Sequence, residues 1–289
     1  MAMHSVADMA GSTLASLRKI AKEKGQPLPV DLSNKDAVAA YMKANNEKYV
    51  GEWNQQLKRQ KFDRVYKQSL WSGRTPIEFN FNSWNSSAQI NTEQANQLYQ
   101  KAQALAKQMV SPDDKPFNVL LKGVPGTGKT SLALAMIDYI RHHGYRWDYI
   151  KQPDGTQNKS KRYVNVFFVA TDEMAELLNR KYDGDSQASS RLFQVIKFAK
   201  MADVLVLDDF GTEGGMKGNL RPVRKDMQEY MYNITNARSG KKQTIITTNN
   251  DDNELKAMYN IKLISRLIPS NPQHVLDFTD LLDVRASMI

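Results

Sequence analysis

The sequence predicts an α/β protein with a largely parallel sheet, preceded by a small helical domain. From Phe117 onward, short apolar runs alternate with stretches of helical periodicity, the pattern of strands joined by crossover helices. A glycine-rich segment lies between the first apolar run and the next helical stretch. By contrast, the residues up to about Pro76 are polar and show helical periodicity.

The composition is that of a soluble protein with a basic excess. Of the 289 residues, 41% are apolar and 25% are charged, and the net charge of +9 favours an anionic partner such as nucleic acid. The absence of cysteine excludes disulfides and thiolate metal sites. No apolar run approaches the roughly 18 residues of a membrane span, and the first residues lack the pattern of a signal peptide. We therefore expect a cytoplasmic protein that does not associate with membranes.

Residues 1–76 are predicted to form a helical, basic domain that binds a partner. Apolar residues at helical spacing run over Ser12–Lys24, and Asn34 is suited to cap a second helix. This second helix, or a successor, runs through Tyr49, Trp53 and Leu57. The segment holds 13 Lys/Arg and 7 Asp/Glu, a net charge of +6. Its basic cluster consists of Lys58, Arg59, Lys61, Arg64 and Lys67, interleaved with Phe62, Tyr66 and Trp71. The cluster is either a docking surface for protein or nucleic acid, or a solvated helix face above packed aromatics.

Residues 77–110 are predicted to be a linker followed by a helix. Thr75–Asn91 is rich in Asn and Ser and poor in charge. Asn91 and Gln94 then resemble a capping pair for a helix over Thr92–Val110, which the proline-containing segment Ser111–Pro116 ends.

Residues 111–289 hold the elements of the α/β domain. The predicted strands are Phe117–Lys122, Val164–Ala170, Val204–Leu207, Thr244–Thr247 and His274–Phe278. The predicted helices are Lys129–His143, Glu173–Tyr182, Ser189–Lys200, Pro222–Arg238 and a pair across Asn253–Leu267. Arg146–Arg162 is predicted to be an exposed polar insertion.

The glycine-rich segment fits the pattern of a phosphate-binding loop, Gly-x-x-x-x-Gly-Lys-Thr, with a strand before it and a helix after it. Glycines let the backbone curl until its amides face phosphate oxygens, and the following helix adds the positive end of its dipole. Lys129 is expected to reach the β- and γ-phosphates, and the Thr130 hydroxyl to ligate Mg²⁺. A glycine turn with a purely structural role is the alternative, and this context disfavours it. We predict ATP and Mg²⁺ as ligands, with ATP bound by Gly123, Val124, Pro125, Gly126, Thr127, Gly128, Lys129, Thr130 and Ser131.

An apolar run that ends in two carboxylates supplies the expected metal partner. Val204–Leu207 leads directly into Asp208 and Asp209. Two acids beside a core strand are costly to desolvate without a cation nearby. We predict that Asp208 holds Mg²⁺ through water and that Asp209 orients and deprotonates the attacking water. An acidic pair that merely faces solvent is the alternative.

A third polar strand end follows at Thr244–Asn250. In many triphosphatases, a polar residue at such a strand tip senses the γ-phosphate. Asn249 is our choice for this role, with Asn250 as the alternative.

With these motifs in order, the chain from about Phe79 onward resembles the AAA+ ATPases, and within them the DnaC/DnaI-type helicase loaders and the related IstB-type transposition ATPases. The resemblance rests on GVPGTGKTSLA (Gly123–Ala133), VLVLDDFGTE (Val204–Glu213), Arg238, TIITTNN (Thr244–Asn250) and LISRL (Leu263–Leu267). It implies a five-stranded parallel sheet in which the asparagine-tipped strand lies between the two nucleotide-binding strands.

The resemblance also implies a catalytic arginine and a DNA-binding channel. Arg266 matches the arginine finger that reaches the γ-phosphate of a neighbouring subunit, so a homo-oligomer is expected. The helices of Glu173–Lys200 correspond to a channel for single-stranded DNA, where phosphates would meet lysines and arginines. The candidate side chains are Arg180, Lys181, Arg191, Lys197 and Lys200, with Lys217–Lys225 as a second basic segment. Either set can equally be a solvated face.

Three departures from the family pattern limit what carries over. A zinc-bearing N-terminal domain of the DnaI type is impossible without cysteine. The final stretch Asp277–Ile289 is too short for a full C-terminal helical lid, and a second-sensor role for Arg285 is open. Asp209 stands where glutamate is commoner, and its shorter reach favours slow turnover.

The preferred function is an ATP-dependent loader that binds a replicative DNA helicase and delivers it to single-stranded DNA, and a phage or mobile-element origin suits the unfamiliar N-terminal domain. The alternative is an IstB-like transposition helper that assembles on DNA and recruits a transposase. A small-molecule or nucleotide kinase is a third possibility, but it would need an acceptor pocket with its own arginines.

Overall fold

The computed structural model describes residues 34–111, 115–151, 155–215 and 219–284. The chain divides into two compact units, Met1–Arg59 and Gln60–Ile289. The predicted helix Ser12–Lys24 lies outside the described residues. Within the described residues, the first unit contains most of one helix, and all other elements belong to the second unit.

Helix α2 (Lys35–Lys67) begins in the first unit and ends in the second. The Asn34 side chain caps it as predicted, because its Oδ1 accepts hydrogen bonds from the amides of Asp36 (3.1 Å) and Ala37 (3.0 Å). Tyr49 and Trp53 lie one turn apart on this helix and are 64% and 63% exposed. Of the basic cluster, the Arg64 and Lys67 side chains are exposed, and those of Lys58, Arg59 and Lys61 lie outside the described part.

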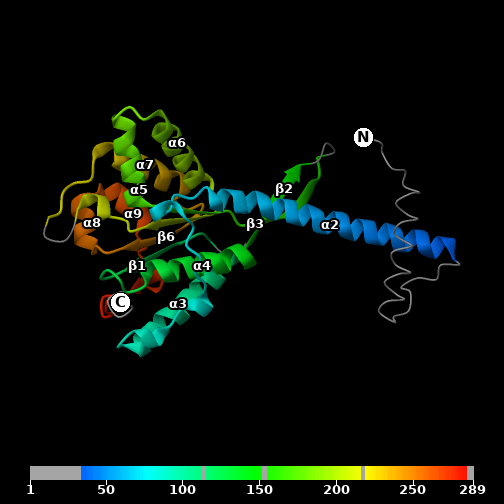
Figure 1. Ribbon diagram of the computed structural model, residues 1–289, viewed down its shortest axis with the longest axis horizontal. Coiled ribbons are helices and arrows are strands. Elements are labelled where there is room, and N and C mark those ends of the chain that lie inside the picture. The colour runs from blue at the N-terminus through cyan, green and yellow to red at the C-terminus, as the bar shows by residue number, and fades with distance from the viewer. Residues whose placement is uncertain (1–33, 112–114, 152–154, 216–218, 285–289) are drawn as a thin grey trace. The chain divides into compact units, whose positions relative to one another are not determined.

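A five-stranded parallel sheet forms the centre of the second unit (Figure 1). Its strands lie in the order β4-β5-β6-β1-β7. Its strands are β1 (Asn118–Lys122), β4 (Val166–Ala170), β5 (Val204–Asp208), β6 (Gln243–Thr248) and β7 (Val275–Asp277). The expected order is confirmed, since β6 lies between β1 and β5. Because all the pairings are parallel, the carboxyl ends of these three strands meet at one edge of the sheet.

Alternating side chains of the buried strands feed two hydrophobic cores, one on each face of the sheet. On one face, Leu121, Phe168 and Val206 pack with residues of helices α3 and α4. On the other face, Leu120 and Phe167 pack with residues of helices α5 to α9. These helices are α3 (Thr92–Val110), α4 (Lys129–His143), α5 (Thr171–Tyr182), α6 (Ser186–Met201), α7 (Lys225–Arg238), α8 (Asp252–Met258) and α9 (Ile261–Leu267).

The segment between α2 and α3 packs against the sheet and against α3. Leu70 extends the edge of β4, because its amide donates to the Phe168 carbonyl and its own carbonyl accepts from Ala170 (both 2.8 Å). Trp71 stacks on the Phe168 ring at 4.3 Å, and Phe81 is buried against Tyr99. Short 3-10 helices occupy Ser72–Arg74, Phe81–Ser83 and Ser86–Ala88 here, and Thr212–Gly214 and Pro272–His274 further on.

The predicted polar insertion is an antiparallel ribbon of β2 (Tyr145–Lys151) and β3 (Gln157–Tyr163), which extends beyond the body of the unit (Figure 1). These strands are hard to recognise in the sequence because β2 alternates aromatic residues with mainly charged ones, and β3 is polar except for Tyr163, so neither strand has the usual aliphatic face. Within the described residues, every helix is too short or too polar to span a bilayer.

Candidate nucleotide-binding site

The phosphate-loop motif turns sharply between β1 and α4, at the carboxyl edge of the sheet. Gly126 and Gly128 have φ angles of 75° and 96°, which favour glycine over residues with a Cβ. Gly128 is also the residue before the first turn of α4, so the free amides of that turn open beside the loop. A Cβ on Gly128 would lie 2.8 Å from the Trp84 ring, which therefore forms a wall of the loop.

The Lys129 ammonium lies inside the loop. The residue is 5% exposed, and its Nζ donates to the carbonyl oxygens of Gly123 (2.8 Å) and Val124 (2.6 Å). Thr127 Oγ1 donates to the same Val124 carbonyl at 2.9 Å. These bonds hold a positive charge where a bound phosphate would need one.

Two hydroxyl-bearing side chains, one from α4 and one from β6, converge on Asp208 at the end of β5. Thr130 at the start of α4 donates to its Oδ1 at 2.9 Å, and Thr247 of β6 donates to the same oxygen at 2.6 Å. Burial raises the pKa of Asp208 to about 6, and the nearby Asp209 charge adds to this rise, while the two threonine hydrogen bonds oppose it. The sequence motifs do not single out Thr247, although it stands two residues before Asn249 in the same strand.

The residues at Asp208 fit a magnesium ion. Mg²⁺ prefers hard oxygen ligands and commonly uses one or two protein side chains, with phosphates and waters completing its shell. The Thr130 hydroxyl and the Asp208 carboxylate offer such a pair. The described residues contain no group of three or more His, Cys, Asp or Glu side chains suited to a metal.

Asp209 follows in an unusual backbone conformation, with a φ of 52°. Thr247 supports it, because its Oγ1 accepts from the Asp209 amide at 2.9 Å and its carbonyl accepts from Phe210 at the same distance. The amide group of Asn249 donates to Asp209 Oδ1 at 3.4 Å. Asn250 instead is buried and bonds Glu254, so of the two asparagines it is Asn249 that contacts Asp209.

A further acid, Glu213, fixes the turn after Asp209. Its carboxylate is enclosed by the Gly211 amide (3.1 Å), the Thr171 hydroxyl (3.2 Å) and the Tyr259 hydroxyl, although the residue as a whole is partly exposed. Burial raises the pKa of this carboxyl to about 7. Thr171 Oγ1 also lies 3.0 Å from the Asp209 carbonyl oxygen, so this network reaches the proposed base. In the sequence, only the position of Glu213 at the end of the acidic motif points to it.

The last described residues lie against the phosphate loop. The Phe278 amide donates to the Lys122 carbonyl at 2.7 Å, and the Val284 amide donates to the Gly126 carbonyl at 3.1 Å. A Cβ on Gly126 would lie 1.9 Å from Asp283 Oδ1, so this carboxylate adjoins the loop. Arg285 lies outside the described residues.

Arg266 lies at the opposite edge of the sheet from the phosphate loop of its own chain. Asn118, the first residue of β1, donates to the Arg266 carbonyl at 3.0 Å. The guanidinium stacks 5.2 Å from the centre of the Tyr232 ring and donates to the Lys262 carbonyl. Arg238, the other arginine of the family motifs, is 2% exposed and donates to carbonyls that include those of Ala199 and Ala202. It therefore closes the end of α6 from inside the core.

The candidate DNA-channel side chains differ in their surroundings. Arg180 is paired with Asp185 at 2.6 Å, Lys181 contacts the Tyr230 hydroxyl at 2.9 Å, and Arg191 donates to the Gln68 carbonyl at 2.7 Å. Lys197 is exposed and Lys200 is half-buried. The segment Lys217–Lys225 is described only from Asn219 onward.

Comparisons with solved structures show likenesses at low sequence identity. This chain is similar to DnaI (15% identity, TM-score 0.49, covering 74% of this chain and 96% of that one). It is also similar to AMPPCP-bound DnaA from Aquifex aeolicus (16% identity, TM-score 0.43, covering 66% of this chain and 48% of that one). A third similar structure is that of a DNA replication initiation factor (18% identity, TM-score 0.44, covering 65% of this chain and 46% of that one). This chain thus spans about half the length of the latter two proteins. The search of curated proteins found no match.

A family model identifies the class of protein. The model of the ATPase family associated with various cellular activities (AAA) matches residues 119–269, more than half of the chain. The matched range includes the phosphate loop, Asp208, Asp209, Asn249 and Arg266. The chain therefore belongs to the AAA family of ATPases.

Proposed function

We propose that this protein hydrolyses Mg·ATP and uses the cycle to load a replicative DNA helicase onto single-stranded DNA in the cytoplasm. The observation that carries the ATPase part is the convergence of Thr130 and Thr247 on Asp208, beside a glycine loop that encloses the Lys129 ammonium. Phosphates would meet the loop amides and Lys129. A magnesium ion would be held by Thr130 and Asp208, and when bound it neutralises charge that develops on the phosphates.

Asp209 would accept the proton of the attacking water, and Asn249 would orient that water and the γ-phosphate. Their 3.4 Å contact supports this pairing, because both groups must reach the same small space. The positive φ of Asp209 is a strained conformation of the kind that often marks functional residues.

Arg266 would complete the site of a neighbouring subunit. Strand β1 is five residues long, so its two ends lie about 13 Å apart, with Arg266 at one end and the phosphate loop at the other. An arginine at this distance from its own loop can serve a second copy of the chain, and the working form would be a homo-oligomer.

The loader function rests on the motif resemblance, and residues 1–76 would bind the helicase. The exposed Tyr49 and Trp53 on α2 are suitable anchors for such a contact, because large aromatic residues dominate protein interfaces. The double variant Tyr49→Ala/Trp53→Ala should lose capture of a replicative helicase in a pull-down while it keeps ATP hydrolysis. Asn46→Ala, an exposed neighbour on the same helix, should keep both.

The same pull-down distinguishes the second candidate function. Capture of a transposase in place of a helicase would favour the IstB-like transposition helper, which would use the same nucleotide site. Retained helicase capture by the double variant would refute the assignment of the docking contact to α2.

A further inference from the structure

The β2–β3 ribbon has two chemically different faces. Side chains alternate along each strand, and the register pairs Trp147 with Lys161 and Tyr149 with Lys159 on one of these faces. We call this the cation–aromatic face, and it consists of Tyr145, Trp147, Tyr149, Lys151, Lys159 and Lys161, together with Gln157 and Tyr163 at the two ends of β3. Within the described strands, this face carries no carboxylate.

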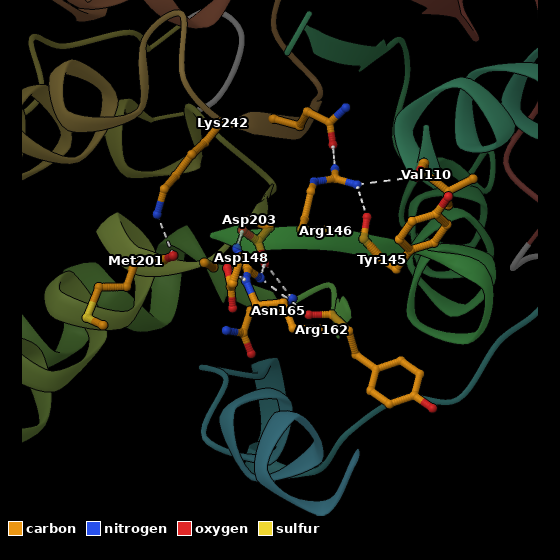
Figure 2. Close-up of polar contacts among 12 residues, drawn as sticks. Val110, Tyr145, Arg146, Asp148, Arg162, Asn165, Met201, Asp203 and Lys242 are labelled. Atoms are coloured by element: carbon orange, nitrogen blue, oxygen red, sulfur yellow. Dashed lines mark hydrogen bonds and ion pairs between the residues drawn. The ribbon is translucent and has the colours of Figure 1, made fainter. Parts of the chain in front are cut away.

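The opposite face anchors the ribbon to the body of the unit (Figure 2). The guanidinium of Arg162 forms two hydrogen bonds to Asp203, at 2.6 and 3.0 Å, and a third to Asp148 at 2.8 Å. Asp203 directly precedes β5, and its Oδ2 also accepts from the Asn165 amide at 2.8 Å. Planar, bidentate pairs of this kind fix geometry as well as charge.

A second arginine ties the ribbon to two other elements. Arg146 donates to the Met109 carbonyl at the end of α3 (3.0 Å) and to Gln243 Oε1 at the start of β6 (2.9 Å). Both arginines are therefore committed to the fold. The two anchors hold the root of the ribbon against the amino edge of the sheet.

On the cation–aromatic face, the lysines rest on aromatic rings. Lys159 Nζ lies 4.2 Å from the centre of the Trp147 ring, and Lys161 Nζ lies 4.2 Å from that of Tyr145. The described residues show no ion pair for either lysine. Tyr149 at the outer part of β2 is 64% exposed. Cation–aromatic contacts at exposed sites are weaker than the stacking of a base on an aromatic ring, so a base can displace the lysine and leave it free to meet a phosphate.

We propose that the cation–aromatic face of the β2–β3 ribbon binds single-stranded DNA, with unpaired bases on its aromatic rings and phosphates on its lysines. Unpaired bases expose the flat surfaces that Trp147 and Tyr149 can stack on, whereas duplex bases are already stacked on one another. An acidic peptide would satisfy the lysines but would leave the rings without a matching partner. The face therefore fits single strands best.

This contact is separate from the nucleotide site. Helix α4 begins at the phosphate loop and ends next to β2, and its 15 residues span about 22 Å. Binding to the ribbon should therefore need no ATP. The proposal rests on the proposed function only for the choice of DNA as the partner. It places that DNA on a surface outside Glu173–Lys200, the segment that the family resemblance suggests as a DNA channel.

The test measures the binding of a fluorescein-labelled oligothymidylate of about 20 nucleotides to nucleotide-free, full-length protein by fluorescence anisotropy. The aromatic variant is Trp147→Ala/Tyr149→Ala, and the charge variant is Lys159→Gln/Lys161→Gln. The matched control, Asn158→Ala/Ser160→Ala, changes the opposite face of the same strand. Thermal unfolding of each variant checks that the protein is folded.

We expect the aromatic variant to bind about ten- to a hundredfold more weakly. For the charge variant, the slope of log affinity against log salt should become shallower by about 1.4, since each lost phosphate contact accounts for about 0.7. The control variant should bind like the wild-type protein. A duplex of the same length should bind more weakly than the single strand.

Four outcomes would overturn the proposal. Wild-type affinity in both ribbon variants would show that DNA binds elsewhere, and it would leave the loader function intact. Equal affinity for duplex and single strand would assign the face to another partner. So would displacement of the oligonucleotide by polyglutamate from the wild-type protein but not from the ribbon variants. Failure of the wild-type protein to bind the oligonucleotide would refute the proposal that this protein binds single-stranded DNA. Helicase capture and ATP hydrolysis, measured on the same variants, report on the loader function independently.

Discussion

The Thr130 hydroxyl donates a 2.9 Å hydrogen bond to Oδ1 of Asp208, a residue 78 positions away in the chain. Thr130 lies just after the loop that follows β1, and Asp208 ends β5, with β6 between the two strands. Thr247 of that middle strand bonds the same oxygen at 2.6 Å. The parallel order of three strands thus builds one oxygen-rich point next to the phosphate loop.

Nucleotide binding should release a proton from Asp208. In the free protein, burial raises the pKa of this carboxyl to about 6, so it is about half protonated at that pH. A magnesium ion favours the ionised form and lowers the pKa, so binding near pH 6 expels part of a proton, and binding near pH 8 expels none. Titration calorimetry in two buffers of different ionisation enthalpy measures the number of protons released on binding.

The variant Asp208→Asn supplies the control for protons that ATP itself releases. At pH 6 it should release fewer protons than the wild-type protein, and at pH 8 the two should agree. Equal proton release at pH 6 would contradict a magnesium site at Asp208.

Glu213 should make the nucleotide-free protein less stable as the pH rises. Its folded-state pKa of about 7 lies above the ordinary 4.5, so the folded protein keeps a proton that the unfolded chain loses between these values. The associated stability is fully present below pH 4.5 and is lost as the pH rises through about 7. The variant Glu213→Gln lacks this pH dependence. Its free energy of unfolding should therefore rise by about 2 kcal/mol relative to that of the wild-type protein between pH 5 and pH 8. Urea unfolding at several pH values measures the difference.

Glu229→Gln on the exposed side of α7 is the matched control for the replacement of a carboxylate, and the pH-dependent gain of Glu213→Gln is measured relative to it. A pH-independent difference between Glu213→Gln and the wild-type protein would show that the Glu213 carboxyl ionises in the folded protein as it does in water.

Arg266→Ala should leave ATP binding unchanged and remove the part of hydrolysis that rises with protein concentration. The reason is its position at the far end of β1 from its own phosphate loop. Steady-state ATPase rates over a range of protein concentrations test this expectation. Lys262→Ala, an exposed cation on the same helix, should behave like the wild-type protein.

Mixing experiments decide whether Arg266 acts on a neighbouring chain. A mixture of Arg266→Ala, which keeps its nucleotide, with Lys129→Ala, which keeps its arginine, should regain activity that neither has alone. An inactive mixture would place the arginine finger elsewhere.

Asp283→Asn should tighten nucleotide binding. The Asp283 carboxylate adjoins Gly126 in the phosphate loop, so its charge repels the incoming phosphates. A carboxylate about 6 Å from a phosphate, partly screened by solvent, weakens the free energy of nucleotide binding by about 1 kcal/mol, which is about fivefold in affinity. Asp280→Asn removes an exposed acid from the same segment and should change affinity much less. Weaker binding by Asp283→Asn would mean that this side chain supports the loop.

Periodicity and motif spacing predicted the sheet because each strand is a short apolar run bounded by helix signals. Helices Thr92–Val110 and Lys129–His143 have their predicted bounds, since capping asparagine and glycine residues mark their ends in the sequence. The site motifs were visible for the same reason, as the phosphate loop and the acid pair are contiguous in the chain.

Long-range contacts could not be predicted from local patterns. Trp84 against Gly128, and Thr247 with Asp208, depend on segments that meet only after the sheet forms. Segment Thr75–Asn91 has the composition of a linker, yet Phe81 and Gln89 are buried, because a few anchors suffice to hold a polar segment. The ribbon of β2 and β3 was hidden by lysines and aromatics in place of aliphatic residues.

The nucleotide site is tested most directly by a calorimetric titration of Mg·ATP into the wild-type protein, Lys129→Ala and the exposed control Lys241→Ala. We predict saturable binding by the wild-type protein and the control. Lys129→Ala should bind at least about a hundredfold more weakly, because it loses charge-assisted hydrogen bonds to the phosphates. Absence of binding by the wild-type protein at saturating Mg·ATP, or equal binding by Lys129→Ala, would contradict the assignment of this site.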